Sequence, residues 1–279
     1  MPATIPVERL QLSNGITVLL VQNDTADIVA GRLLLRHAGS RWESAAEGGL
    51  FHLLSTVLTK GTEIRDAFQI AEAIESVGAA LSADATSDYF GLAFKCVTPD
   101  FPDLIKLAAE LLRSPTFPTN EIEREKYVTL QNIRSQQEQP FNVAFQQLRD
   151  GLYGDHPYAR SVLGTEETVR GLGQSQLMIC HQQFFRPDNL VISLSGRLQR
   201  ETVLDLLEAV FADWRSPAES MPTLQLPTPI ARPDTFSLEQ DSQQATVMLG
   251  YLAPSSHSPH YPVLKLVSSY LGSGLSSRL

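Results

Sequence analysis

Apolar and polar residues alternate along much of the first forty positions, with the two-residue period that is typical of β-strands. Two such runs, 7–12 and 16–21, flank the dipeptide Asn14-Gly15. Because Asn-Gly accepts the positive φ angles of a tight turn, we expect a β-hairpin here. Another β-rich run covers 28–37.

The spacing of apolar residues then changes to that of helices. Leu50, Leu53, Leu54 and Val57 recur at helical intervals and predict a helix over 47–59. The same reasoning predicts helices over 64–77 and 100–113, a β-hairpin over 79–97, a helical region over 120–152 broken at Pro140, short helices from Thr165 and Ser175, a strand over 191–194 and a helix over 201–214.

The composition changes after this last helix. Residues 216–233 hold five prolines and little apolar periodicity, so we interpret them as a linker. A strand over 245–252 and a helix over 261–271 are expected beyond it. Since this order weakly repeats that of 28–61, the predicted organisation is a first domain over 1–215 and an incomplete second domain over 234–279 that copies it.

Composition and charge exclude several classes of protein. Hydrophobic residues make up 43% of the 279 positions and charged residues 19%, as in globular proteins. The net charge of -9 argues against nucleic acid and weakly favours a basic peptide partner, although acidity that only aids solubility explains it equally. The sequence shows neither a signal peptide nor an apolar run long enough for a membrane helix, so we expect a cytoplasmic protein.

The segment 48–62, Gly-Gly-Leu-Phe-His-Leu-Leu-Ser-Thr-Val-Leu-Thr-Lys-Gly-Thr, carries the candidate chemistry. It resembles G-L-A-H-F-L-E-H-M-x-F-K-G-T of the pitrilysin and insulinase zinc peptidases, the inverzincins, whose H-x-x-E-H motif binds zinc. In that resemblance His52 matches the first ligand, Ser55 stands at the position of the catalytic base, and Thr56 replaces the second histidine.

The third zinc ligand of that family lies in a pattern like E-R-E-R-x-V-x-x-x-E, which 123–132 resembles without a gap. Asn132 occupies the ligand position. Hydroxyl and amide oxygens are poor zinc donors beside imidazole and carboxylate, so the resemblance implies no catalytic residue and no metal in this chain. His52 is then most simply a partly buried imidazole without a metal role.

Further stretches share the resemblance. Gly78 begins a segment similar to the G-G-x-x-N-A edge strand, which in the family pairs with substrate backbone. The resemblance therefore implies substrate binding by Ala79, Ala80, Leu81, Ser82 and Ala83. Residues 156–169 are close to H-P-Y-G-R-P-x-L-G-T-x-E-T-V, residues 185–190 to Y-R-P-D-N-M, and residues 271–279 to L-G-x-G-x-S-S-R-L-F of the family's second domain.

The family resemblance implies an α/β (α+β) metallopeptidase-repeat fold, with a mostly antiparallel sheet, helices on one face and a second similar but incomplete domain. It implies a non-catalytic subunit that helps to bind peptide. The implied partner is a homologous subunit that holds zinc, in a heterodimer, and the alternative is a homodimer of this chain. Two alternatives remain open. One is an active zinc endopeptidase or processing peptidase with unusual ligands, and the other is a structural core-type subunit without a peptide role.

Overall fold

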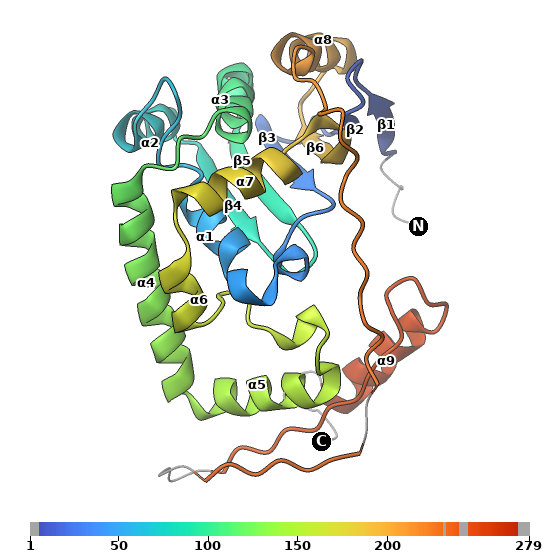
Figure 1. Ribbon diagram of the computed structural model, residues 1–279. Helices are drawn as coiled ribbons and strands as arrows, with labels where there is room; N and C mark the ends of the chain where they lie inside the picture. The colour runs from blue at the N-terminus through green and yellow to red at the C-terminus, as the bar shows by residue number, and fades with distance from the viewer. Residues whose placement is uncertain (1–5, 231–232, 240–244, 273–279) are drawn as a thin grey trace.

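The computed structural model describes residues 6–230, 233–239 and 245–272. Its centre is a six-stranded sheet with the strand order β1-β2-β6-β3-β5-β4 (Figure 1). The strands are β1 (Glu8–Gln11), β2 (Thr17–Gln22), β3 (Ile28–Leu35), β4 (Ala80–Ala85), β5 (Phe90–Val97) and β6 (Leu190–Gly196).

Antiparallel pairing dominates this sheet. β1 and β2 form the predicted hairpin around Asn14-Gly15, and β4 and β5 form the second one. β3 lies between β5 and β6 and runs antiparallel to both, whereas β6 runs parallel to β2. The expected mostly antiparallel sheet is therefore confirmed, with β1 and β4 at its two edges.

Helices cover one face of the sheet and extend beyond it. The α-helices are α1 (Leu50–Val57), α2 (Ala67–Glu75), α3 (Phe101–Arg113), α4 (Thr119–Glu138), α5 (Pro140–Tyr153), α6 (Glu166–Gly171), α7 (Gln174–Phe184), α8 (Arg200–Phe211) and α9 (Tyr261–Gly272). Short 3₁₀ helices cover Ser40–Trp42, Ala45–Glu47, Thr98–Asp100, Pro157–Ala159 and Pro187–Asn189. The helices predicted from the sequence are confirmed within a few residues at each end.

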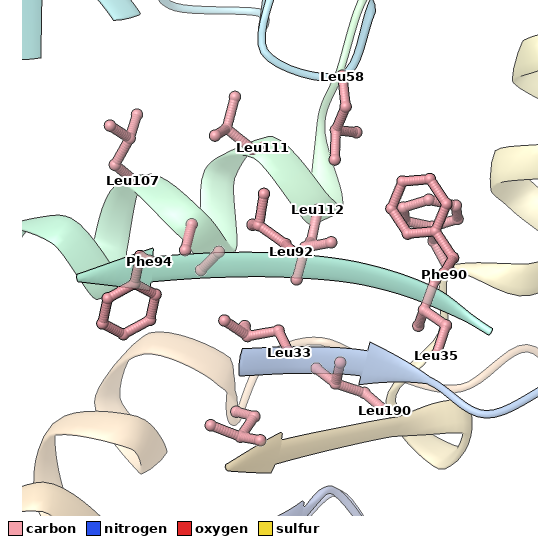
Figure 2. Packing of buried hydrophobic residues seen from close by; sticks show 14 of the residues in the cluster. Leu33, Leu35, Leu58, Phe90, Leu92, Phe94, Leu107, Leu111, Leu112 and Leu190 are labelled. Carbon is pink, nitrogen blue, oxygen red and sulfur yellow. The ribbon is translucent and has the colours of Figure 1, made fainter. Parts of the chain in front are cut away.

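The core lies between one face of the sheet and the helices that cover it. Along β3, Val29, Leu33 and Leu35 are buried while Ile28 and Arg32 on the other face are exposed. Figure 2 shows buried leucines and phenylalanines of β3 and β5 beside α3, whose Leu107, Leu111 and Leu112 belong to the same cluster. This one-sided burial confirms helices on one face of the sheet, because apolar side chains alternate with polar ones along each strand.

The predicted break at Pro140 separates two helices that meet at a sharp angle (Figure 1). Gln139 between them has an extended backbone, and Pro140 is the first residue of α5. Proline is accepted at this position because the first amides of a helix have no partner within the helix. The bend leaves a cavity between α4 and α5, which residues preceding α1 also line.

One predicted element is wrong. Residues 245–252 form no strand; they run extended past α5, where Gly250 lies close to Leu148 and Leu152. Val247, Leu249 and Tyr251 remain 82%, 85% and 85% exposed. A strand requires a hydrogen-bonded neighbour, and no described residue pairs with this segment, so alternation alone did not produce one.

Beyond residue 233, α9 is the regular element among the described residues, and the expected repeat of the first domain stays a prediction. Described residues of the predicted linker 216–233 contain no helix or strand. The division into 1–215, 216–233 and 234–279 stays a prediction, and residues 273–279 of the final motif, including Arg278, lie outside the described residues.

Candidate functional site

The first turn of α1 is held by a buried carboxylate. Glu43 accepts hydrogen bonds from the backbone amides of Gly49 (3.0 Å) and Phe51 (2.8 Å). Burial outweighs these bonds and raises the pKa of Glu43 to about 7. The sequence analysis gave Glu43 no role, because it precedes the helix by too many residues for an ordinary N-cap.

The segment 156–169 lies against the same turn. The Thr168 hydroxyl donates to the carbonyl of Gly48 (2.7 Å), and Arg160 donates to the carbonyl of Glu43 (3.1 Å). A Cβ on Gly164 would lie 2.1 Å from the Gly48 carbonyl oxygen, so only glycine allows this approach. Two motifs that looked separate in the sequence therefore form one structural unit.

α1 presents the three positions of the degenerate zinc motif. His52 is half-buried, and burial lowers the pKa of its imidazole. The Ser55 hydroxyl donates to the carbonyl of His52 (2.7 Å), and the Thr56 hydroxyl donates to that of Leu53 (2.9 Å). Both hydroxyls are thus engaged by the backbone of their own helix.

The fourth position of the motif lies on α4, and this helix packs against α1. Asn132 lies on α4 and is exposed. Glu125, seven residues earlier, pairs with Lys60 at 3.5 Å. The buried ammonium of Lys126 donates to the carbonyls of Arg170 and Leu172, which fixes α4 to the C-terminal end of α6.

These residues do not fit a zinc ion. Zinc sites in proteins use imidazole, thiolate and carboxylate, and catalytic sites use three such ligands. The site offers one imidazole, at His52, beside two hydroxyls bonded to the helix and one carboxamide. Across the described ranges there is no group of three or more His, Cys, Asp or Glu residues placed to hold a metal.

The candidate peptide-binding segment forms an edge of the sheet. β4 pairs with β5 along one side, and no described strand pairs with its other side. α1 packs beside β4, so this edge lies next to the degenerate motif. Ala80 and Ser82 are exposed on β4, Leu81 and Ala83 are half-buried, and Ala79 directly precedes the strand.

Two family models match the sequence of this chain. The sequence model of "Insulinase (Peptidase family M16)" matches residues 17–166, just over half of the chain, and that of "Peptidase M16 inactive domain" matches 172–279. The chain belongs to the peptidase M16 family. This confirms the resemblance drawn from the 48–62 and 123–132 motifs.

Individual M16 relatives agree with the family assignment. The chain is 26% identical to the uncharacterized zinc protease YmxG of Bacillus subtilis over 98% of this chain and 66% of that protein. It is 28% identical to an uncharacterized zinc protease of Mycobacterium leprae over 86% of this chain and 55% of that protein. The chain thus spans between about half and two thirds of these relatives' length.

Solved M16 structures share the fold. A protease from Helicobacter pylori superimposes with a TM-score of 0.75 at 20% identity, covering 80% of this chain and 54% of that one. A peptidase M16 inactive domain from Pseudomonas fluorescens gives 0.73 at 26% identity with the same coverage. None of the helices in the part of this chain that is described is long and apolar enough to cross a membrane.

Proposed function

We propose that this chain is a non-catalytic member of the M16 family that binds peptide and positions it for the zinc site of a homologous partner subunit. One observation carries the proposal: the hydroxyls of Ser55 and Thr56, at the base and second-ligand positions, are hydrogen-bonded to α1 carbonyls. An oxygen engaged in this way, on a side chain that stays protonated, neither takes a proton from water nor binds zinc well.

Peptide binding is supported by the free edge of β4. An extended peptide added there would satisfy the unpaired main-chain groups of the strand, as in other cases of β-strand addition. Asp84 lies on the same strand and forms no ion pair with any described residue. An unpaired carboxylate at the edge, together with the net charge of -9, favours peptides that carry basic side chains.

The partner in this proposal is a homologous subunit with an intact zinc motif. The relatives described above are named zinc proteases, and the same fold in a partner would place a complete motif on the equivalent helix. The resulting assembly is a heterodimer in which this chain contributes one wall of the peptide site. Zinc is supplied by the partner, and a cytoplasmic location stays a prediction.

The deciding experiment combines metal analysis with a cleavage assay. We expect the purified chain to hold far less than one zinc per molecule and to cleave no peptide, but to bind basic peptides and to raise cleavage by the zinc-bearing homologue. Stoichiometric zinc and hydrolysis, both abolished by His52→Ala, would instead indicate an active endopeptidase. A stable complex with the homologue but no peptide affinity would indicate a structural subunit.

A further inference from the structure

A cavity lies outside the degenerate motif and the edge strand. It has a volume of about 470 Å³ and occupies the angle between α4 and α5, beside the N-terminus of α1. This volume falls within the ~300–1,000 Å³ of ligand-binding pockets. We call it the amide groove, after the carboxamide side chains that line it: Gln136, Gln137, Asn142, Gln146 and Gln147.

Most of these carboxamides are available to a ligand. The side chains of Gln136, Gln137 and Gln147 form no hydrogen bond with any other described residue. Gln146 and Asn142 differ. The Gln146 amide donates to Asp150 (2.8 Å) and to the carbonyl of Ala159 (2.7 Å), and the Asn142 amide donates to Gln139 (3.0 Å). Each free carboxamide offers a donor and an acceptor, which match the two hydrogen-bonding groups of a peptide unit.

The groove carries charges of both signs. Asp150 accepts from Gln146, and Arg160 donates to the carbonyl of Glu43, and neither forms an ion pair with a described residue. A ligand with a single charge would lose part of its hydration and meet a like charge as well as an opposite one. Ile133 of α4 and Val143 of α5 add apolar surface to the lining, so an uncharged occupant with at least one apolar side chain fits this chemistry.

We propose that the amide groove binds an uncharged, extended peptide segment. Its main-chain or carboxamide groups pair with Gln136, Gln137 and Gln147, and an apolar side chain packs on Ile133 and Val143. None of the groove's lining residues belongs to β4. Loss of peptide binding at β4 would leave the groove intact, so this proposal and the proposed function fail separately.

A direct test measures fluorescence anisotropy of a terminally blocked peptide, Gly-Asn-Val-Gln-Gly, with the full chain. We expect a triple variant to weaken peptide binding at least about tenfold; it combines Gln136→Ala, Gln137→Ala and Gln147→Ala. The matched control is Gln131→Ala, an exposed glutamine of α4 outside the groove, which should change the affinity less than about twofold. Val143→Trp, which fills the groove, should weaken binding by a similar factor to the triple variant.

Three results would overturn the proposal. The first is equal affinity in the wild type and in the triple variant. Gln136 and Gln137 are exposed and Gln147 is half-buried, so the triple variant should stay folded, which its melting temperature checks. A second is tighter binding of lysine- or glutamate-containing peptides of the same length. The third is a dimer in sedimentation velocity that the triple variant abolishes, because a second copy of the chain would then occupy the groove.

Discussion

The hydroxyl of Thr168 donates a hydrogen bond of 2.7 Å to the main-chain carbonyl of Gly48. These residues are 120 positions apart in the chain, and each lies in a stretch whose sequence resembles a motif of the M16 family. Thr168 also belongs to the capping box of α6, so a single side chain joins the starts of α6 and α1. The positions of His52, Ser55 and Thr56 depend on this junction, because it fixes the first turn of α1.

Gly164→Ala should disrupt the junction. Gly164 has a φ of 77°, and a Cβ there would lie 2.1 Å from the Gly48 carbonyl oxygen. We expect the free energy of unfolding to fall by at least about 2 kcal/mol from backbone strain and the clash. Chemical denaturation measures this loss. Gly171→Ala is the control, since a Cβ on Gly171 meets no atom within 4 Å, and equal losses in both variants would contradict the prediction.

Glu43 should make stability depend on pH. Burial raises the pKa of its carboxyl from 4.5 to about 7, so the folded state binds more protons than the unfolded state between these values. The free energy of unfolding from this group therefore falls as pH rises from 4.5 to 7, by about 3 kcal/mol at ~1.4 kcal/mol per pKa unit. Urea titrations across this pH range should show the fall in the free energy of unfolding in the wild type. The same fall in Glu43→Gln would show that Glu43 is not the titrating group.

Lys126→Met should destabilise the attachment of α4. The ammonium of Lys126 is buried and donates to the carbonyls of Arg170 (3.1 Å) and Leu172 (3.0 Å). Methionine leaves these acceptors without their donor, which should cost about 3 kcal/mol in thermal or urea unfolding. Lys106→Met offers a comparison, because Lys106 is exposed and pairs with Asp103; its loss should stay below about 1 kcal/mol.

Restoring the family residues should create a zinc site. A double variant with Thr56→His and Asn132→Glu keeps the native His52. It therefore carries the three ligands of the inverzincin motif on α1 and α4. We expect about one zinc per chain by elemental analysis, where the unaltered chain holds little. Ser55→Glu in this background adds the base and should be needed for any peptide cleavage. Zinc uptake no greater than in the wild type would show that α1 and α4 are misplaced for coordination.

Ser82→Asn should strengthen peptide binding at β4. The family motif carries Asn at this position, and Ser82 is exposed on the free edge. The asparagine amide can donate a hydrogen bond to the added peptide, and one such bond contributes ~1 kcal/mol. We therefore expect the affinity for a basic peptide to rise roughly threefold or more. Titration calorimetry measures the change. A peptide methylated on alternate backbone nitrogens should bind neither protein; equal affinity for it would rule out strand addition.

The hydrophobic pattern by itself predicted most elements of the first two hundred residues. The hairpin at Asn14-Gly15, the helix around His52 and the break at Pro140 all followed from local chemistry, which acts over a few residues. The same local evidence failed at 245–252, because a strand also needs a partner. The resemblance to the family motifs also predicted His52, Ser55, Thr56 and Asn132 as the positions of the degenerate zinc site, and this assignment stays a prediction.

Tertiary structure decided how these residues are held. The sequence did not reveal that Glu43 receives the amides of α1, that Gly164 touches Gly48, or that the glutamines of α4 and α5 share one groove. Each of these contacts joins residues that are more than a helical turn apart in the chain. Local periodicity carries no information about such pairs, because packing of whole elements sets which side chains meet.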